Sequence, residues 1–155
     1  MTTIYLGADH AGFRLKEAVK PYLRSLGVAF KDLGAHRFVK TDDYPVYAAK
    51  IARAVAKSKS RGILFCGSSF GMCIAANKIK GSRAVSVNNV IDAKLVRLHN
   101  DANVLCLSGG GTLDKLSPGL KPELAKKIIK TFLFTVFSNE ERHRRRIKQI
   151  AALEK

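Results

Sequence analysis

Short apolar runs alternate along the chain with longer stretches in which apolar residues recur every three or four positions. The short runs predict strands at residues 4–6, 28–33, 62–66, 83–87 and 103–108. The longer spacing predicts helices over residues 13–26, 44–55, 72–78, 91–98, 122–136 and, last, about 139–154. Strands that alternate with helices in this way predict an α/β fold, a three-layer α/β/α Rossmann-like sandwich with a central parallel sheet of about five strands.

Proline and acidic residues mark where the first two helices should begin or bend. Pro21 lies inside the first helical stripe, where it should kink the helix or reset its start. Asp42 and Asp43 can supply an N-cap for the second helix, and Pro45 fits its first turn.

The last two helices carry signals of their own. Pro122 opens the first of them, whose apolar stripe is expected to face inward at Leu124, Ile128, Ile129, Phe132, Leu133 and Val136. Ser138 and Glu141 have the spacing of a capping box, which is expected to begin the last helix.

The composition fits one soluble domain that spans residues 1–155. Hydrophobic residues make up 46% and charged residues 26%, ordinary shares for a globular protein. No apolar run is long enough to cross a bilayer, and the first residues lead into a strand rather than a signal peptide, so we expect a cytoplasmic protein. Cys66, Cys73 and Cys106 lack metal-ligand spacing and are odd in number, so we expect reduced thiols.

The charge is unusual, because 28 Lys and Arg residues against 12 Asp and Glu residues give a net charge of +16. A positive field of this size attracts nucleic acid, an acidic membrane surface or phosphorylated metabolites, and does not choose among them. The densest basic run, residues 142–148, is of a kind that is usually a solvated helix face. Because no basic motif is interleaved with aromatic residues, nucleic acid is the less favoured partner.

The most informative stretch is residues 66–78, which follow a run apolar enough for a strand buried on both faces. Its glycines and serines predict a tight loop between that strand and a helix. Such a junction aims backbone N–H groups and the positive end of a helix dipole at a small volume beside the Cys66 sulfur, where an oxyanion would be stabilised. Taken alone, a Cys-Gly-Ser segment is more often a structural turn with an inert thiol.

In open parallel sheets, ligands bind outside the carboxyl ends of the strands. Asp9 and His10 follow the first predicted strand, residues 66–71 follow the central one, and a glycine-rich loop from Gly109 follows the last. A thiol, a carboxylate and an imidazole are therefore expected at one edge of the sheet.

Cys66 could act there as a base or as a nucleophile. Lowering a thiol pKa from about 8.5 towards about 7 needs about 2 kcal/mol of preferential thiolate stabilisation, which a helix N-terminus supplies only in favourable geometry. A base also needs an oxyanion cradle, which the amides of residues 67–71 could form. A nucleophile needs an oriented histidine, and no local signature ties His99 to Cys66. Arg142 and Arg146 lie one helical turn apart and could grip a phosphate dianion.

Five segments, spread in order over nearly the whole chain, make it resemble the ribose-5-phosphate isomerase B family, which shares its fold with the subunits of galactose-6-phosphate isomerase. They are Gly7-Ala-Asp-His-Ala-Gly12, Asp43-Tyr-Pro45, Cys66-Gly-Ser with Gly71 and Ala75-Ala-Asn-Lys78, His99-Asn-Asp-Ala-Asn103, and Arg142-His-Arg-Arg-Arg146. The resemblance implies an aldose–ketose isomerase that needs no metal or cofactor. It would interconvert ribose 5-phosphate and ribulose 5-phosphate through an enediolate, in the non-oxidative branch of the pentose phosphate pathway.

By the same resemblance, the catalytic residues would be Cys66, Ser68, Asp9 and His99. Cys66 would be the base that moves a proton between C1 and C2, and Ser68 would belong to the anion hole. His99 would help to open the furanose ring, with Asp9 near the ring oxygen.

The implied substrate-binding residues divide by the group that they contact. The other members of the anion hole would be Gly67, Ser69 and Gly71. The sugar would be lined by Tyr44 and Asn100, and its phosphate would be held by His10, Arg142 and Arg146. Members of the family are homodimers, sometimes paired into tetramers, that build each site from two subunits. The last helix, about 139–154, would contribute to phosphate binding and to dimerisation.

Three features depart from the family pattern. Ser69 stands where a glycine is common, and if that position needs a positive φ, the serine carries about 1 kcal/mol of strain or the loop is reshaped. Gly110 stands where a phosphate-binding arginine is common, unless Lys115 or another loop cation replaces it. The loop of residues 113–121 is longer and richer in proline and glycine than is usual, and could reshape the mouth of the pocket.

Two other functions stay open from the sequence. The same chemistry could act on a six-carbon sugar phosphate, such as allose 6-phosphate or galactose 6-phosphate, because Gly110 and the longer loop leave the pocket length open. A basic binding module that kept the fold without turnover would instead bind duplex nucleic acid or RNA with a steep salt dependence.

Overall fold

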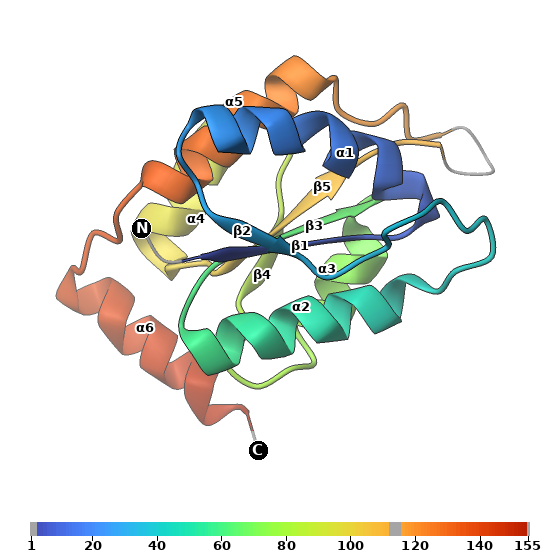
Figure 1. Cartoon of the computed structure of the whole chain (residues 1–155). Helices are drawn as coiled ribbons and strands as arrows, with labels where there is room; N and C mark the ends of the chain where they lie inside the picture. The colour runs from blue at the N-terminus through green and yellow to red at the C-terminus, as the bar shows by residue number, and fades with distance from the viewer. Residues whose placement is uncertain (1–2, 112–115, 155) are drawn as a thin grey trace.

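A computed structural model describes residues 3–111 and 116–154 as a parallel sheet flanked by helices (Figure 1). Its strands are β1 (Ile4–Ala8), β2 (Phe30–Asp32), β3 (Gly62–Cys66), β4 (Ala84–Ser86) and β5 (Val104–Ser108). The helices are α1 (His10–Ser25), α2 (Tyr44–Ser58), α3 (Phe70–Ala76), α4 (Val90–Asn100), α5 (Pro122–Phe134) and α6 (Glu141–Ala152). The predicted α/β sandwich with a five-stranded parallel sheet is confirmed. Within the described residues, no helix has the length and apolar character needed to cross a membrane.

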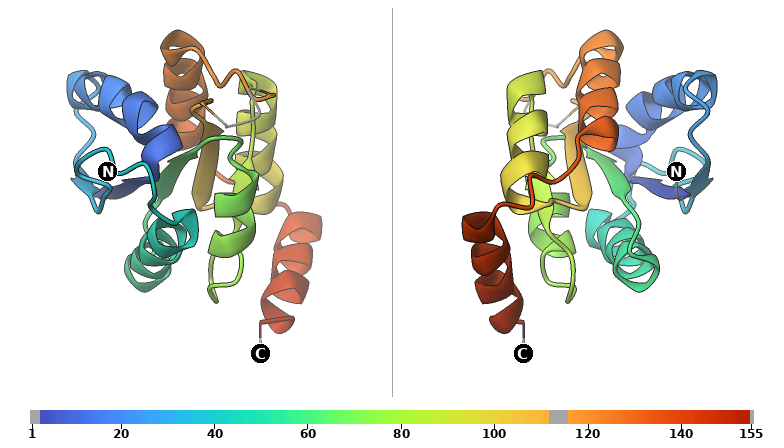
Figure 2. Two further views of the ribbon diagram at one scale, coloured as in Figure 1. Left: turned by 90° about the vertical axis from the view of Figure 1, so that its right-hand side faces the viewer. Right: turned by 90° about the vertical axis from the view of Figure 1, so that its left-hand side faces the viewer.

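Two apolar clusters, one on each face of the sheet, hold the layers together (Figure 2). On one face, α1, α4 and α5 pack on the strands through residues such as Leu15 and Ile128. On the other face, α2 and α3 contribute Ile51 and Met72. Every residue of β3 is buried, because this strand lies in the middle of the sheet and is covered on both sides. That burial explains why its sequence is an uninterrupted apolar run.

The strand order β2-β1-β3-β5-β4 places a switch point between β1 and β3, where the chain turns from one half of the sheet to the other. Ala8 pairs with Phe65, and Cys66 pairs with Ser108, so the last residues of β1, β3 and β5 lie together. We call this end of the sheet the carboxyl edge, and the end at which the strands begin the amino edge.

One expectation about the helices is wrong, and two hold in part or stay open. α1 continues through Pro21, so the proline does not reset the start of the helix, and a kink there stays a prediction. In α5, Leu124 is 37% exposed, and Val136 lies beyond the end of the helix and is 77% exposed, so neither faces the core. Asp43 takes the N-cap position of α2 as expected, although its side chain makes no capping hydrogen bond.

The capping box expected at the start of α6 does not form. Glu140 occupies the N-cap position, and the Ser138 hydroxyl lies 2.8 Å from His143 Nδ1 instead. His143 is the buried residue of α6 and stacks on His99, with the ring centroids 4.6 Å apart. α6 is thus attached by its first turn to the end of α4, while much of the helix stands away from the sheet (Figures 1 and 2).

A buried lysine ties α1 to the end of β2. Lys16 is fully buried, and its Nζ lies 2.6 Å from Asp32 Oδ2 and donates to the Ala35 carbonyl at 2.6 Å. Lys20 pairs with the same carboxylate. Burial alone would raise the pKa of Asp32, but hydrogen bonds from Lys16 and Lys20 outweigh burial and hold that pKa below its ordinary value. The pair therefore stabilises the fold as long as Asp32 is ionised.

Asp32→Asn should lower the free energy of unfolding by about 3 kcal/mol at neutral pH, because it removes the closer carboxylate from the buried Lys16 ammonium and leaves it the partly exposed Glu17 carboxylate at 3.2 Å. Since the folded-state pKa of Asp32 is lowered, its contribution is present at neutral pH and is lost as the pH falls below about 4. Urea denaturation at neutral and at acidic pH measures both effects.

The double variant Lys16→Met with Asp32→Asn is the matched control. It removes the buried charge together with its partner and should recover most of the lost stability. A single variant that stays within about 0.5 kcal/mol of the wild type would show that the pair is not a structural anchor.

Candidate active site

Cys66 ends β3 at the carboxyl edge and begins the strand-loop-helix junction that the sequence predicts. Its side chain is almost covered, and the residue is 7% exposed. The backbone N–H groups of Gly67 and Ser69 hydrogen-bond to its sulfur. α3 begins at Phe70, two residues earlier than the sequence suggests, so its positive end lies close to the thiol. The junction therefore brings loop amides to the sulfur as expected.

Ser69 has the positive φ that the sequence left open, with φ of 72° and ψ of −22°. This left-handed conformation costs a serine about 1 kcal/mol relative to glycine. The Ser69 hydroxyl lies within hydrogen-bond distance of the Ser86 hydroxyl on β4 and donates to the Ser68 carbonyl. The side chain thus ties the loop to β4, a contact that glycine could not make.

Asp9 lies beside the thiol because α1 packs closely on the end of β3. Its Oδ1 accepts a hydrogen bond from the Gly12 N–H at 2.9 Å, which caps α1. A β-carbon on Gly12 would lie 2.0 Å from the carbonyl carbon of Phe65, so only glycine allows this approach. The buried Asp9 carboxylate then faces the Cys66 thiol and hydrogen-bonds to it.

Burial, and then the charge and hydrogen bond of Asp9, raise the pKa of the Cys66 thiol to about 11. The amides of Ser69 and Gly67 act in the opposite direction and are outweighed. The loop amides and helix dipole considered from the sequence therefore do not make Cys66 a thiolate at neutral pH. Removing its proton there costs about 5 kcal/mol, and the thiolate so formed is a strong base.

His10, the first residue of α1, is oriented by Asp42, which the sequence singled out only as a helix cap. Asp42 Oδ1 lies 2.7 Å from His10 Nδ1 and accepts the His10 backbone N–H at 2.9 Å. With Nδ1 held by the carboxylate, Nε2 is the ring nitrogen left for a ligand. Burial, and then the charge of Asp42, raise the pKa of the Tyr47 hydroxyl, which faces the same carboxylate. The signal for this role in the sequence was the pair of adjacent aspartates, Asp42 and Asp43, in a strongly basic chain.

Tyr44, the first residue of α2, lies over the loop that follows Cys66. A β-carbon on Gly71 would meet the Tyr44 ring at 2.6 Å and its hydroxyl oxygen at 3.0 Å. Tyr44 is 40% exposed. It therefore brings an aromatic ring and a hydroxyl to the carboxyl edge, as expected for a residue that lines a sugar.

The segment that follows β5 hydrogen-bonds to the end of β3 and to the loop that follows Cys66. The Gly109 N–H donates to the Cys66 carbonyl at 2.7 Å, and the Gly110 N–H donates to the Gly67 carbonyl at 3.0 Å. Gly110 has a φ of 73°, and a β-carbon there would lie 2.6 Å from the Pro118 carbonyl oxygen. An arginine does not fit at this position without moving the loop. Lys115, the substitute considered from the sequence, lies outside the described residues.

A hollow of about 640 Å³ opens beside this loop. Its polar lining consists largely of hydroxyl groups, which come from Ser68, Ser69, Ser86, Ser108 and Ser117. Hydroxyls that both donate and accept suit a polyhydroxylated ligand. Across residues 3–111 and 116–154, the structure holds no group of three or more His, Cys, Asp and Glu side chains arranged to bind a metal ion.

Two predicted site residues on α4 lie at the opposite, amino edge. His99 and Asn100 end this helix, next to Asp101, which pairs with Arg83 just before β4. A five-residue strand spans about 16 Å, so neither side chain reaches Cys66 within one chain.

The two predicted phosphate ligands on α6 lie with them. Arg142 and Arg146 are exposed, and Arg142 Nε pairs with Glu140 Oε2 at 2.8 Å. The stacking of His143 on His99 holds this helix near the amino edge. The structure thus groups eight predicted residues at the carboxyl edge and sets these four apart, the eight being Asp9, His10, Tyr44, Cys66, Gly67, Ser68, Ser69 and Gly71.

The sequence profile of a protein family described as Ribose/Galactose Isomerase matches residues 4–150. The chain is 39% identical to the probable ribose-5-phosphate isomerase B of Mycoplasma genitalium, over 98% of this chain and 95% of that protein. It is also 39% identical to the ribose-5-phosphate isomerase B of Escherichia coli, over 99% of this chain and 97% of that protein. The resemblance drawn from the five sequence segments is confirmed.

Solved structures give the same result. A crystal structure of ribose-5-phosphate isomerase B from Mycoplasma genitalium with bound ribulose 5-phosphate superposes with a TM-score of 0.89 at 37% identity, covering 98% of this chain and 95% of that one. The type B ribose 5-phosphate isomerase of Trypanosoma brucei superposes with a TM-score of 0.88 at 40% identity, covering 99% of this chain and 100% of that one.

Asp9→Asn should lower the pKa of the Cys66 thiol from its value of about 11, because asparagine keeps the cap on Gly12 and removes the negative charge. The rate at which iodoacetamide alkylates Cys66, followed by mass spectrometry of its peptide across a pH series, measures this pKa. At mildly alkaline pH the variant should react about tenfold faster than the wild type.

Glu154→Gln, which removes a carboxylate that binds the Gly81 N–H far from the thiol, is the matched control and should leave the rate unchanged. Equal pH profiles for Asp9→Asn and the wild type would show that Asp9 does not control the thiol.

Proposed function

The chain belongs to the ribose/galactose isomerase family, and from that premise we propose that it interconverts ribose 5-phosphate and ribulose 5-phosphate with Cys66 as the base. Its relatives in sequence and structure are ribose-5-phosphate isomerases B, so the protein is an aldose–ketose isomerase. A relative holds ribulose 5-phosphate in its crystal, which supports this choice of substrate. The observation that carries the proposal is a thiol held between the Asp9 carboxylate and the loop amides.

The reaction moves one proton between two carbons. In the open-chain aldose, the Cys66 thiolate would remove the proton from C2, the C–H electron pair would form the C1–C2 double bond, and the carbonyl oxygen on C1 would become the oxyanion. The amides of residues 67–71 and the Ser68 hydroxyl would donate hydrogen bonds to that oxygen. The thiol would return its proton to C1 while the C2 hydroxyl passes its proton to the oxygen on C1, which leaves a ketone at C2.

Asp9 is placed to supply the thiolate, because its carboxylate already hydrogen-bonds to the thiol and can accept its proton. Releasing the thiol proton to water at neutral pH costs about 5 kcal/mol, because the pKa of the thiol is about 11. That cost fits beneath a barrier of about 16 kcal/mol, which corresponds to about ten turnovers per second. Because the pKa of the thiol is so high, the thiolate is basic enough to remove a proton from carbon.

His10 would bind the phosphate through Nε2, because Asp42 holds its Nδ1. The neighbouring Gly110 contributes no cation, and the close approach of Pro118 leaves no space for one there. One imidazole is a weak match for a phosphate dianion, so further cations are needed. Arg142 and Arg146 would supply them, although both lie at the amino edge of their own chain.

A homodimer resolves this separation. With twofold symmetry, the amino edge of one subunit can face the carboxyl edge of the other at two equivalent sites. Each site would combine Cys66 and His10 of one subunit with His99, Asn100, Arg142 and Arg146 of the partner subunit. The partner's His99 would then lie where it can help to open the furanose ring. Assembly of dimers into tetramers, a cytoplasmic location and a place in the pentose phosphate pathway belong to the same proposal.

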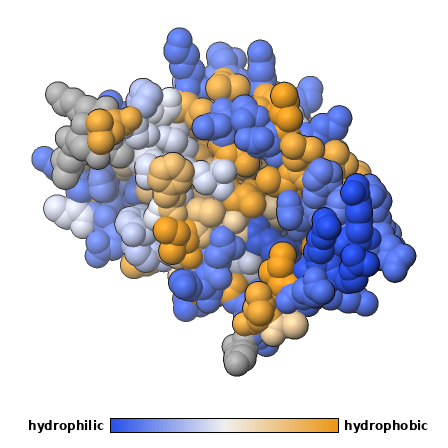
Figure 3. All heavy atoms as spheres, turned by 180° about the vertical axis from the view of Figure 1, so that it is seen from behind, coloured by the Kyte–Doolittle hydropathy of each residue, from blue (hydrophilic) through white to orange (hydrophobic). Residues whose placement is uncertain are grey.

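An exposed apolar patch supports the dimer. Phe70 and Ile74 of α3 are 65% and 64% exposed, and Ile91 and Leu95 of α4 are 71% and 40% exposed. These two helices lie on the same side of the molecule as β4, the last strand of the sheet (Figure 2). Figure 3, which views the molecule from behind, shows apolar side chains gathered on this face next to a strongly hydrophilic region. Contiguous apolar surface of this kind marks an interface with another protein.

A six-carbon sugar phosphate is the second candidate substrate. The observation that favours it is the hollow of about 640 Å³ beside Gly110, where no arginine side chain limits the length of the ligand. The proton transfer at C1 and C2 would be the same for both sugars.

Cys66→Ala should lower kcat on ribose 5-phosphate by about 10²–10⁴-fold with a smaller change in KM, because it removes the base and leaves the phosphate ligands in place. A spectrophotometric assay of ribulose 5-phosphate formation measures both constants. Cys73→Ala on α3 is the matched control and should keep activity within about threefold of the wild type. Parallel assays on allose 6-phosphate compare the substrates, and an active Cys66→Ala protein would exclude the proposed base.

Mixing the Cys66→Ala and His99→Ala proteins, each inactive alone, should restore roughly a quarter of wild-type activity after subunit exchange. Half of the randomly formed dimers are mixed, and each mixed dimer has one site in which both residues are intact. Coexpression with two different affinity tags isolates the mixed dimer for assay.

The control for this experiment pairs Cys66→Ala with Asp9→Ala, two residues that the proposal assigns to the same subunit's half of the site. Their mixture should recover nothing. Absence of recovery for the first pair would contradict a site shared between subunits.

A further inference from the structure

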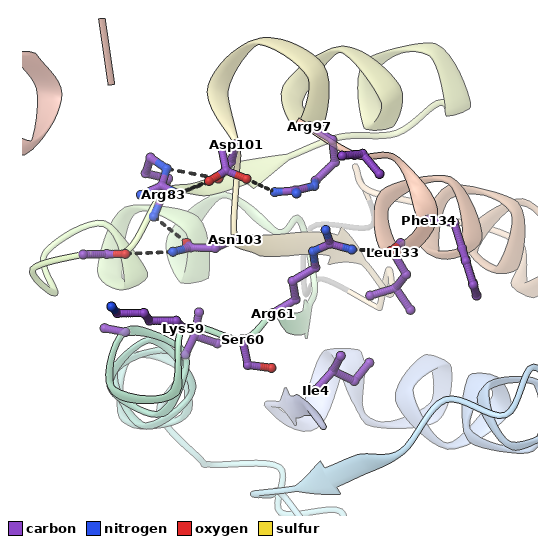
Figure 4. Close-up of a pocket in the computed structure, with 14 residues that line it drawn as sticks. Ile4, Lys59, Ser60, Arg61, Arg83, Arg97, Asp101, Asn103, Leu133 and Phe134 are labelled. Atoms are coloured by element: carbon purple, nitrogen blue, oxygen red, sulfur yellow. Dashed lines mark hydrogen bonds and ion pairs between the residues drawn. The ribbon is translucent and has the colours of Figure 1, made fainter. Parts of the chain in front are cut away.

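A second cavity lies at the amino edge, at the opposite end of the sheet from Cys66 (Figure 4). Its volume is about 850 Å³, larger than the hollow lined by Ser68 and Ser69 and within the range of small-molecule sites. The start of β1, the chain between α2 and β3, and the segment that follows α5 form its walls. None of the residues assigned to the isomerase site lines it.

The charges in this cavity are unbalanced, because four cations and a single carboxylate line it. Arg83 Nη2 lies 2.9 Å from one oxygen of Asp101, and Arg97 Nη1 lies 2.7 Å from the other. One carboxylate is therefore already shared between two guanidinium groups. Lys59 and Arg61 are the remaining cations, and neither forms an ion pair with a carboxylate in the part of the chain that the structure describes.

Of the two cations without an ion pair, Arg61 is the more buried. Its guanidinium donates to the Leu133 carbonyl, a neutral partner. Burial, and then the nearby charge of Arg97, lower the pKa of Arg61. Figure 4 shows Arg61 lying between Arg97 and the turn that carries Lys59. An anion at this point would face the Arg61 guanidinium, and Lys59, whose side chain points away from Arg61 in Figure 4, lies further along the cavity.

Most of the rest of the wall is apolar, with Ser60 and Asn103 as its polar members. The large apolar side chains are Ile4, Val55, Leu133, Phe134 and Val136. Phe134 and Val136 are 49% and 77% exposed, although both are large apolar side chains. In Figure 4, Phe134 lies on the side of the cavity away from Lys59. The cavity thus offers a cationic end and an aromatic end to one ligand.

We propose that this cavity binds a phosphorylated ligand with a flat apolar part, of the class of the nucleoside phosphates. Arg61 and Lys59 would hold the phosphate groups, since guanidinium and ammonium groups are the common partners of phosphate. The base would pack against Phe134. The site is separate from the isomerase site, and the proposal does not depend on which sugar phosphate is isomerised.

Calorimetric titration of the wild-type protein with ADP at physiological salt should show saturable binding. Lys59→Gln and Arg61→Gln should each weaken it by about tenfold, as expected for the loss of one charge-assisted contact. Lys57→Gln removes the same charge from the last turn of α2 without lining the cavity, and should change binding by less than about twofold. Phe134→Ala should weaken the binding of ADP but not that of pyrophosphate, which has no base.

Saturating ribose 5-phosphate should leave ADP binding unchanged, because none of the residues assigned to the isomerase site lines this cavity. Displacement of ADP by the sugar would place the nucleotide in the isomerase site and overturn the proposal. So would an absence of saturable heat, or equal effects of Lys59→Gln and Lys57→Gln. If Arg61→Gln fails to fold because its contact with Leu133 is lost, the exposed Lys59 still gives the decisive comparison.

Discussion

In a parallel sheet with helical connections, every strand runs one way and every connecting helix runs back. Residues that follow a strand therefore gather at the carboxyl edge, and residues that end a helix gather at the amino edge. Here that constraint places Asp9 and Cys66 at one edge and His99 at the other. The chain carries two groups of site residues that one subunit cannot join, so the proposed catalysis depends on a second copy whose opposite edge completes the site.

The chemistry of the thiol depends on how closely α1 approaches β3. Because Gly12 has no β-carbon, the first turn of α1 reaches the end of β3 and brings the Asp9 carboxylate to the sulfur. The negative charge opposes the loop amides, which would otherwise favour the thiolate. A thiol with a pKa of about 11 stays protonated at neutral pH. In the proposed mechanism, the contact that suppresses the resting thiolate would also give the thiol proton a route to Asp9.

Much of the carboxyl edge could be predicted from the sequence, because local patterns determine it. An uninterrupted apolar run gave β3, and the rule for parallel sheets then brought Asp9, His10 and Cys66 together. Features that depend on contacts between distant segments could not be predicted. Ser138 has the spacing of a cap, but His143, whose ring packs against His99 of the distant α4, engages its hydroxyl instead. Likewise, no spacing in the sequence links the arginines that line the amino-edge cavity.

Part of the net charge of +16 lies at the amino edge, on α6 and around the second cavity. Arg142 and Arg146 of α6 are exposed, and Arg142 pairs with Glu140 in its own subunit. In the proposed dimer they would face the partner's hollow, and a cleft lined by one sign of charge concentrates anions and speeds their capture. In the amino-edge cavity, Arg61 lies in the field of Arg97, and the Asp101 carboxylate, which pairs with Arg97, offsets only part of that field. A phosphate bound there, as we propose, would place negative charge beside both guanidinium groups and would relieve part of their repulsion.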